Sequence, residues 1–467
     1  MTEIHVLDPA TGAVVGTVPD GDARAATDAV DAAHAAFDTW RATPARRRSE
    51  LLRRTYELML RDADRLTALI CAENGKSEAD ARSEVIYAAE FFRWYAEEAV
   101  RPGGDYGPSP AGGTRSLVTY RPVGVAALVT PWNFPAAMAT RKIAPALAAG
   151  CTVVLKPAAE TPLTALAVAD LLVEAGVPDG VVNLVTTSDP GEVVSTWLAD
   201  PRVRKISFTG STRIGRLLLR QAAGRVINAS MELGGNAPFV VTADADLEAA
   251  VAGAMVAKFR GGGQACTAAN RFYVHADVVE EFTARLGAAV EALTVGPAST
   301  GAAIGPLISR TAVDTVTALV DRAVLQGARI AHRSALPADP VAAKGTFYPP
   351  TVLADVPPDA DILDEEIFGP VAPIVAWTDE AAMLRAVNAS EMGLAAYVFA
   401  GDLGYALRLG EAIEAGMVGI NRGLVSDPAA PFGGMKQSGL GREGGRAGLQ
   451  EFCETQYLSV DWRESLL

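Results

Sequence analysis

The segment VGVAALVTPWNFP (Val123–Pro135) begins as a short apolar run and ends in a polar turn that closes on a proline. Three similar apolar runs follow it, and each leads into a segment with helical spacing: CTVVLKP, VVNLVT and KISFTG. Runs that are apolar throughout, rather than at alternate positions, are typical of strands buried on both faces. The alternation therefore predicts a parallel sheet built from βαβ units.

A second α/β series begins near Pro238. Its first strand is predicted at APFVVT, and a helix is expected from Asp246. Further strands are predicted at RFYVH, PIVAW, AAYVFA and MVGIN, with another at TQYLSVDW near the end of the chain. The fold class is thus α/β, with two domains and small appended strands.

Helices are predicted through most of the first hundred residues. Asp22 can cap an Ala-rich helix that reaches Trp40, and Pro44 suits the first turn of the next helix. RPGGDYGPSPAGG (Arg101–Gly113) is predicted to be a loop because of its composition. SLVTYRPVG follows as an edge strand or a hairpin, and Pro122 limits it to an edge because it has no N–H to donate to a second neighbour.

Composition excludes several classes of protein. The 467 residues allow two large domains or three smaller ones, and their net charge of −14 argues against binding to nucleic acid or to a membrane surface. The four cysteines form no CxxC pair and the four histidines are scattered, so neither a disulfide scaffold nor a metal site is expected. No signal peptide and no apolar run of ~18 residues is visible, which predicts a cytoplasmic enzyme.

Cys266 lies in FRGGGQACTAANR, directly after three glycines. Missing side chains leave room for a substrate there, and an accessible thiolate is what a nucleophile needs. A buried structural cysteine is the alternative. The local sequence leaves both open.

Two further motifs carry polar groups next to turns. Glu232 in MELGGNAP could be a simple turn charge or a general base acting on water. Asn133 in TPWNFP could cap a helix, or its amide could hold an oxyanion at the carboxyl end of a parallel strand. Trp132 beside it could be simple packing.

KISFTGSTRIG reads as a strand, then a turn from Gly210 through Ser211 to Gly215, and then a helix. N–H groups at the start of a helix can hold a phosphate, although the motif is not GxGxxG. Lys156 in VLKPAAETP ends another strand, where its ammonium could bind ribose hydroxyls or phosphate. The alternative is a solvated lysine.

The joint order of these motifs resembles the aldehyde dehydrogenase superfamily. The chain carries, at the spacing of that superfamily, the successive motifs TPWNFP, VLKPxxETP, FTGSTxxG, ELGGNAP, GQxCxxxNR, EEIFGP and PFGGxKxSGxGREG. The resemblance as a whole runs from Ile4 to the C-terminus. The resemblance implies a Rossmann-like NAD(P)-binding domain at 1–111 and 125–236, a catalytic domain at 237–432, and oligomerisation strands at 112–124 and 450–467. It also implies a homodimer or homotetramer.

The resemblance also implies roles for individual residues. Cys266 would be the nucleophile, Glu232 the base for the deacylating water, and Asn133 with the Cys266 N–H the oxyanion hole. Lys156 and Glu366 would hold ribose hydroxyls, Phe368 would pack on the nicotinamide side, and Ser211 would meet the pyrophosphate. The remaining residues assigned to the cofactor site are Thr130, Trp132, Ala159, Gly210, Gly215 and Leu233.

Within the superfamily, KFRGGGQAC, AANRFYV and GINRGLVSDPAAPFGG are similar to the succinate-semialdehyde dehydrogenase branch. That resemblance implies that Arg141, Arg260 and Ser426 grip the remote carboxylate of the substrate, with Phe134 lining the same channel. A buried, unpaired guanidinium is costly, so two arginines in one pocket favour an anionic ligand. The alternative is that both arginines pair with nearby Asp or Glu.

The predicted function is NAD(P)-dependent oxidation of succinate semialdehyde to succinate. Alternatives are another acid-aldehyde such as glutarate semialdehyde, a broader aldehyde set, a cofactor-binding protein without catalysis, or a thiol hydrolase. Where NAD-preferring relatives carry Glu three residues after the lysine, this chain has Ala159, and the acid stands one residue on at Glu160. The position predicts a preference for NADP, with NAD accepted less well.

Overall fold

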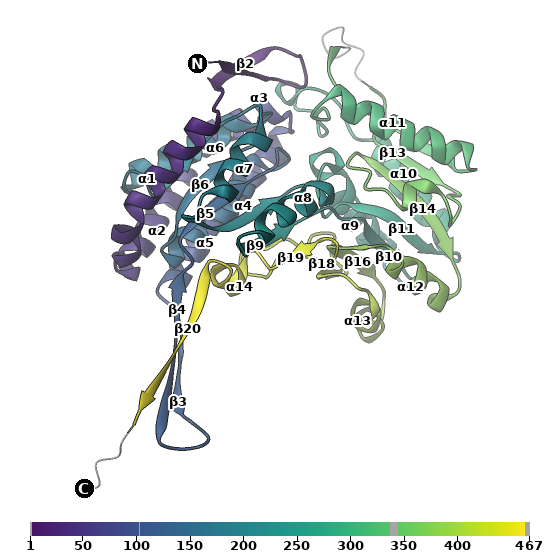
Figure 1. Cartoon of the computed structure of the whole chain (residues 1–467). Helices are drawn as coiled ribbons and strands as arrows, with labels where there is room; N and C mark the ends of the chain where they lie inside the picture. Colours follow the sequence, from purple (N-terminus) through teal and green to yellow (C-terminus); the bar gives the residue numbers. More distant parts are fainter. Residues whose placement is uncertain (1, 102, 337–343, 463–467) are drawn as a thin grey trace.

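The computed structural model describes residues 2–101, 103–336 and 344–462. Two α/β domains lie side by side, and a narrow arm of strands extends away from the first of them (Figure 1). The predicted fold class is confirmed. No helix in the described part of the chain is long and apolar enough to cross a membrane.

The first domain is built on a six-stranded sheet. In spatial order its strands are β19 (Gly439–Leu440), β9 (Asn228–Glu232), β8 (Val203–Thr209), β5 (Val125–Val129), β6 (Thr152–Lys156) and β7 (Val182–Leu184). All neighbours are parallel except β19, which runs antiparallel to β9. The four strands predicted from VGVAALVTP, CTVVLKP, VVNLVT and KISFTG are confirmed. β9 has no predicted counterpart, because its sequence NASME mixes polar and apolar residues.

Helices cover both faces of this sheet, which explains the uninterrupted apolar runs. In β5, Val125, Ala127 and Val129 pack into one layer, whereas Ala126 and Leu128 pack into the other. The first layer contains α1 (Ala23–Ala42), α7 (Pro190–Ala199) and α8 (Thr212–Ala223). The second contains α2 (Ala45–Arg61), α3 (Ala63–Asn74), α4 (Glu78–Ala99), α5 (Pro135–Ala149), α6 (Pro162–Ala175) and α14 (Gly445–Gln450).

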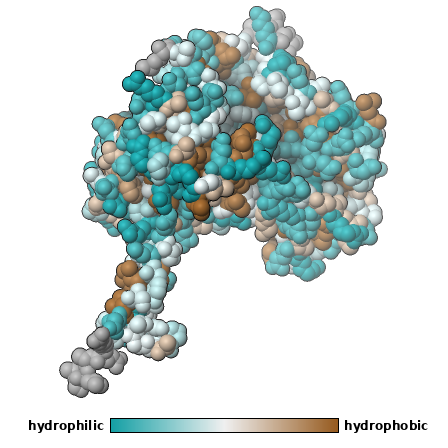
Figure 2. Space-filling view, in the orientation of Figure 1, coloured by the Kyte–Doolittle hydropathy of each residue, from teal (hydrophilic) through white to brown (hydrophobic). Residues whose placement is uncertain are grey.

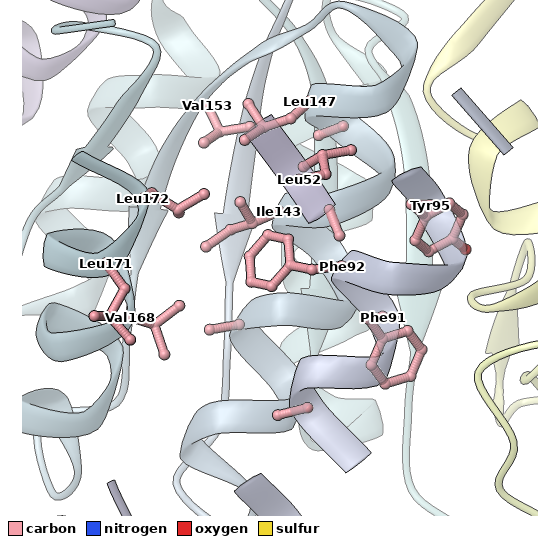
Figure 3. Packing of buried hydrophobic residues seen from close by; sticks show 14 of the residues in the cluster. Leu52, Phe91, Phe92, Tyr95, Ile143, Leu147, Val153, Val168, Leu171 and Leu172 are labelled. Atoms are coloured by element: carbon pink, nitrogen blue, oxygen red, sulfur yellow. The ribbon is translucent and has the colours of Figure 1, made fainter. Parts of the chain in front are cut away.

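Figure 3 shows the interior of the second layer, where Phe92 of α4, Ile143 of α5 and Leu172 of α6 point into one apolar core. The predicted cap of α1 is also confirmed. The Asp22 carboxylate accepts hydrogen bonds of 3.0 Å from the N–H groups of Arg24 and Ala25.

The second domain is built on a seven-stranded sheet. Its order is β12 (Arg329–Arg333), β13 (Thr351–Ala354), β14 (Val371–Trp377), β11 (Ala269–His275), β10 (Ala237–Val241), β16 (Ala395–Phe399) and β17 (Met417–Ile420). Only β12 is antiparallel to its neighbour among the described strands of this sheet. The five strands predicted for this series are confirmed as β10, β11, β14, β16 and β17.

Helical segments again cover both faces of this sheet. α9 (Leu247–Ala254) and α10 (Val279–Glu291) lie on one face, and α11 (Arg310–Leu325), α12 (Glu380–Asn388) and α13 (Leu403–Ala412) lie on the other. The helix expected from Asp246 is confirmed as α9, and the Asp246 carboxylate caps it. α9 continues into the short turns η1 (Met255–Phe259) and η2 (Arg260–Gly263), which lead to Cys266; η3 (Ala298–Thr300) and η5 (Asp361–Leu363) lie in connections.

The arm is a three-stranded antiparallel sheet in the order β20 (Cys453–Asp461), β4 (Thr114–Pro122) and β3 (Asp105–Pro108). Two predictions are wrong here. The segment Arg101–Gly113 contains β3 rather than loop alone, and β4 is the central strand rather than an edge. Pro122 is tolerated because β3 pairs only with residues 115–118, so Pro122 has a partner strand on one side alone. The strand predicted at TQYLSVDW is confirmed as β20.

The chain returns to the first domain after β17. β18 (Met435–Lys436) pairs with β15 (Met392–Gly393), β19 joins the first sheet, and α14 packs into its core. A separate hairpin of β1 (Glu3–Leu7) and β2 (Val14–Pro19) precedes α1. The domain limits given above stay predictions, and residues 1, 102, 337–343 and 463–467 within them lie outside the described residues.

Candidate active site

The carboxyl ends of four parallel strands in the first domain carry most of the predicted polar residues. β5 leads to Thr130, Trp132 and Asn133, β6 ends at Lys156, β8 leads to Gly210 and Ser211, and β9 ends at Glu232 before Leu233. These strands are neighbours in one parallel sheet, so their carboxyl ends lie along one edge. Cys266 comes from the second domain, in the turn between η2 and β11.

The turn that holds Cys266 follows three glycines with left-handed backbone conformations. The φ angles of Gly261, Gly262 and Gly263 are +59°, +65° and +73°, where a residue with a Cβ is strained. A Cβ on Gly263 would lie 2.3 Å from the carbonyl oxygen of Gly369. From sequence alone, these glycines are attributed to the room that a substrate needs. Gly261 does line a cavity, but the backbone conformation and the close contact at Gly263 are the stronger reasons for the triplet.

Cys266 lies between two cavities and lines both. The first cavity, of about 180 Å³, is also lined by the predicted substrate residues Phe134, Arg141, Arg260 and Ser426; we call it the arginine cavity. The second, of about 270 Å³, is also lined by Trp132, Asn133, Gly210, Ser211, Leu233, Glu366 and Phe368; we call it the strand-end cavity. Cys266 is the one described residue common to the two. A nucleophile in this position can meet one small molecule from each side.

Arg260 is available to a ligand. Its side chain is half-buried, and its guanidinium carbon lies 5.6 Å from the centre of the Phe134 ring. No carboxylate of the described residues forms an ion pair with it. The alternative prediction, that this arginine pairs with a nearby acid, is therefore wrong for Arg260. Ser426, also half-buried, supplies a hydroxyl to the same cavity.

Arg141 is more constrained. Its guanidinium donates to the Tyr87 hydroxyl at 2.9 Å and lies 3.5 Å from the Glu443 carboxylate, over the face of the Phe432 ring. The alternative prediction of an acidic partner thus applies to Arg141. Its Nε is buried with no hydrogen-bond partner among the described residues, so the pairing is incomplete.

A hydrogen bond joins the Asn133 side chain to the loop that carries Cys266. The Asn133 Nδ2 donates to the Gln264 carbonyl oxygen at 3.0 Å, which joins the turn after β5 to the Cys266 loop. An amide nitrogen carries two protons, so one remains for a ligand. The N–H of Cys266 donates to no acceptor within the described residues. Two donors at one point can stabilise a tetrahedral oxyanion.

Burial raises the pKa of the Cys266 thiol to about 12, although the positive charge of Arg141 opposes this rise. The carboxylates of Glu366, Glu232 and Glu443 add to it. The resting side chain is therefore a thiol at neutral pH, and a base must remove its proton when it reacts.

Glu232 is buried at the end of β9, and its Oε2 has no hydrogen-bond partner among the described residues. Burial raises the pKa of this carboxyl well above its usual range, and the nearby Glu443 carboxylate adds to the rise. Lys142 and Arg141 act in the opposite direction. A carboxyl with a raised pKa and a free oxygen is suited to general acid–base work at neutral pH.

Glu443 and Lys142 form a buried pair beside this carboxyl. The Lys142 ammonium donates to Glu443 and, at 3.0 Å, to the Ser207 hydroxyl. Glu443 is thus shared between Lys142 and Arg141, which divides one negative charge between two cations. Sequence reasoning quoted the GREG motif without giving Glu443 a role.

The strand-end cavity holds two aromatic rings and a carboxyl. The rings of Trp132 and Phe368 pack edge to face, with 5.5 Å between their centroids. Phe368 has a left-handed φ of +49°. The Glu366 Oε1 accepts from the Gly235 N–H at 3.2 Å, and burial raises the pKa of Glu366 to about 7. Ser211 caps α8, where its hydroxyl accepts from the Ile214 N–H.

Four predicted cofactor residues do not line the strand-end cavity: Thr130, Lys156, Ala159 and Gly215. Gly215 has a packing reason, since a Cβ there would lie 2.4 Å from the Leu233 side chain. The Lys156 side chain is buried, and its ammonium forms no hydrogen bond or ion pair with the described residues. Burial lowers its pKa, and the charge of Glu160 opposes that change. Ala159 is half-buried and Glu160 is exposed.

The comparison with known proteins agrees with this geometry. Residues 1–458 match the family model described as the aldehyde dehydrogenase family. The chain belongs to the aldehyde dehydrogenase family. The family resemblance and the enzyme class predicted from the motifs are thereby confirmed.

Individual relatives of this aldehyde dehydrogenase are similar over nearly their whole length. A succinate-semialdehyde dehydrogenase of Paenarthrobacter nicotinovorans is 50% identical over 448 residues, which are 96% of this chain and 99% of the relative. A glutarate-semialdehyde dehydrogenase of Pseudomonas putida is 47% identical, over 98% of this chain and 94% of the relative. A crystal structure described as an E. coli NADP-dependent enzyme has a TM-score of 0.96 and 46% identity, covering 99% of this chain and 95% of the other.

Sequence reasoning missed the contribution of α4 and of the segment before it to this aldehyde dehydrogenase site. Lys76, Asp80, Glu84 and Tyr87 line the arginine cavity. The lysine of ENGKS, Lys76, is buried in the structure, with a side chain that is 4% exposed. A lysine in a short connection between helices is usually solvated, so only the fold distinguishes this one.

We predict that alkylation of Cys266 by iodoacetamide in the cofactor-free enzyme accelerates about tenfold per pH unit between pH 6 and pH 9. The thiolate fraction rises in that proportion while the pH stays far below a pKa of about 12. The measurement is the rate of labelling at each pH, with Cys266 identified by peptide mapping. A free thiol compound serves as control and should level off near pH 9. A plateau for Cys266 near pH 7 would contradict the raised pKa.

Proposed function

We propose that this aldehyde dehydrogenase oxidises succinate semialdehyde to succinate, with NADP as its preferred cofactor. The observation that carries the proposal is the unpaired Arg260, which shares a cavity with Ser426 and Cys266. A guanidinium without a carboxylate partner favours an anionic ligand, and a four-carbon acid-aldehyde has its carboxylate at the end remote from the reacting carbon. The relatives named for succinate and glutarate semialdehyde support this substrate class.

The strand-end cavity and its surroundings fit a nicotinamide dinucleotide. Lys156 offers a buried ammonium without a hydrogen-bond partner, and Ser211 lies at the N-terminus of α8, which favours an anion. In this proposal Lys156 and Glu366 hold ribose hydroxyls, Ser211 meets the pyrophosphate, and Phe368 packs on the nicotinamide side. A nicotinamide bound there would supply the acceptor for the hydride that the substrate loses.

The reaction begins when the Cys266 thiol loses its proton to solvent. The thiolate sulfur then adds to the aldehyde carbon, which turns the carbonyl oxygen into an oxyanion. The Asn133 amide and the Cys266 N–H donate hydrogen bonds to that oxyanion. When the carbon–oxygen double bond re-forms, the hydrogen on the same carbon leaves with its electron pair. The substrate is then held to Cys266 as a thioester.

Glu232 completes the cycle. Its carboxylate removes a proton from a water molecule, and the water oxygen adds to the thioester carbon. The carbon–sulfur bond breaks, which releases the acid and restores the Cys266 thiol. The raised pKa of Glu232 makes it a stronger base than an exposed carboxylate.

A second candidate substrate is glutarate semialdehyde, which is one carbon longer; a broader aldehyde range is a further alternative. The 47% identity to a glutarate-semialdehyde dehydrogenase favours the first of these. Absorbance of the reduced cofactor, followed with succinate semialdehyde, glutarate semialdehyde and butanal, ranks the candidates directly. A catalytically inactive cofactor binder would show no signal, and a thiol hydrolase would cleave thioesters without reducing the cofactor.

The three-stranded arm supports a proposed homodimer or homotetramer. Its strands leave the first domain, and Figure 2 shows hydrophobic atoms on its surface. Tyr106, Tyr457, Leu458, Val460 and Trp462 contribute exposed apolar area there. A sheet with open edges and exposed apolar side chains is suited to pairing with another copy. The predicted cytoplasmic location stays a prediction.

We expect Cys266→Ala to abolish aldehyde oxidation while cofactor binding persists. Glu232→Gln should instead give a burst of reduced cofactor followed by a steady state slowed by about 10²- to 10⁴-fold, because only deacylation loses its base. Stopped-flow absorbance separates the two phases. Sizeable activity in Cys266→Ala, or the absence of a burst in Glu232→Gln, would contradict the assigned roles.

We predict that Arg260→Met lowers kcat/KM for succinate semialdehyde by about 2–4 kcal/mol, or roughly 30- to 1,000-fold, and changes kcat/KM for butanal much less. The reason is that only the acid-aldehyde places a carboxylate against this guanidinium. Arg82→Met is the matched control, because Arg82 pairs with Asp64 outside the arginine cavity. Equal losses on both aldehydes would show that Arg260 is structural.

The turn after β6 carries Ala159, the residue on which the predicted cofactor preference depends. We expect wild-type kcat/KM to be higher with NADP than with NAD, and Ala159→Glu to shift the ratio towards NAD by repelling a 2′-phosphate. Glu160→Gln is the control at the neighbouring exposed position, where the ratio should move by no more than about fivefold. A wild type that favours NAD, or a ratio that Ala159→Glu leaves unmoved, would refute the preference.

A further inference from the structure

The connection between α3 and α4 holds the turn that carries Asn133. The Asn74 Nδ2 donates to the Trp132 carbonyl oxygen at 2.9 Å, and the Lys76 ammonium donates to the Asn133 carbonyl oxygen at 2.6 Å. Two consecutive carbonyl groups of the TPWNFP turn are thus fixed by two side chains from one short segment. These contacts come from residues that are far from the turn in sequence.

Lys76 is itself held by a buried carboxylate. Its ammonium forms an ion pair with Glu84, and the side chains of Lys76 and Glu84 are 4% and 0% exposed. The other Glu84 oxygen accepts from the N–H groups of Ala136 and Ala137, at 2.9 and 3.3 Å, in the first turn of α5. Glu84 therefore connects Lys76 to the start of the helix that follows Asn133, so the turn is fixed on both sides.

The Asn133 side chain has little else to hold it. Its Nδ2 makes one hydrogen bond, to the Gln264 carbonyl oxygen, and its Oδ1 is buried without a partner among the described residues. A side chain with a single anchor takes its position largely from its own backbone. That backbone is where the Lys76 ammonium bonds.

We propose that Lys76 is a positioning residue of the oxyanion hole: by binding the Asn133 carbonyl oxygen and pairing with Glu84, it fixes the direction of the Asn133 amide. The inference rests on the proposed function, in which that amide stabilises the tetrahedral oxyanion. Lys76 acts through Asn133 and does not itself touch the reacting atoms.

Lys76 also lines the arginine cavity, so it could instead bind the substrate carboxylate. The geometry argues against that role. An ammonium has three donors; one goes to Glu84, one to the Asn133 carbonyl, and the group lies 3.7 Å from the centre of the Phe134 ring. Its charge is neutralised by Glu84, in contrast to the unpaired Arg260.

The test is a double-mutant cycle between Lys76→Met and Asn133→Ala, with kcat/KM measured for succinate semialdehyde and butanal. We expect Lys76→Met alone to lower kcat/KM about 10- to 100-fold on both aldehydes, which is less than the roughly 10²- to 10³-fold cost of losing the oxyanion donor itself. In the Asn133→Ala background it should lower kcat/KM less than about threefold, because the amide it positions is gone. Equal effects in both backgrounds, or a loss confined to succinate semialdehyde, would overturn the proposal.

Two further variants keep the result interpretable. Lys76→Met leaves Glu84 as an unpaired buried carboxylate, so Lys76→Met/Glu84→Gln removes both charges and should show the same dependence on Asn133 if the single variant does not fold. Lys205→Met is the control for losing a buried ammonium, since Lys205 donates to Asn228 and Ser230 in the first sheet. Its effect should be the same in both backgrounds. Wild-type activity and the loss in Asn133→Ala test the proposed function separately.

Discussion

One sulfur atom must be reached from two cavities at once, and this constraint organises the site. Cys266 belongs to the second domain, whereas Asn133 and Glu232 belong to the first, and residues of both domains line the strand-end cavity. The bond from Asn133 to the Gln264 carbonyl joins the two domains beside the sulfur. The left-handed glycines before Cys266 let its loop come within contact of Gly369 without a side chain between them. Small backbone errors in either domain would therefore misplace the reacting groups.

Burial raises the pKa values of the titratable groups around Cys266 and makes their charged forms costly. Cys266, Glu232 and Glu366 all have raised pKa values, each mainly because of desolvation. Lys142 and Arg141 supply positive charge nearby, and Glu443 shares its carboxylate between them. Without those cations a second buried carboxylate beside Glu232 would raise its pKa further and keep it protonated. The network thus sets how basic Glu232 can be.

Local sequence was sufficient for most strands of the two large sheets, because apolar runs are short-range patterns, and it supplied the residues of the predicted site. Uninterrupted apolar runs identified β5, β6, β8, β10 and β11, and motif order identified Cys266, Glu232 and Asn133. Long-range pairing was not visible. Pro122 suggested an edge strand, yet β4 pairs with a strand on each side. The proline is tolerated because β3 ends before it reaches that position. Lys76 and Glu443 became site residues only when distant helices placed them against the β5 turn and Glu232.

The cations near Cys266 are not equivalent, which matters for substrate choice. Lys76 is committed to Glu84 and to the Asn133 carbonyl, and Arg141 is partly committed to Glu443 and Tyr87. Arg260 alone among these three has no carboxylate partner in the described structure. An incoming carboxylate therefore gains most from Arg260, while the free Nε of Arg141 offers a weaker second contact. The sequence suggests two equal arginines, whereas the structure pairs Arg141 with Glu443 and leaves Arg260 without a carboxylate partner among the described residues. This difference supports the proposed role of Arg260 as the principal anion site.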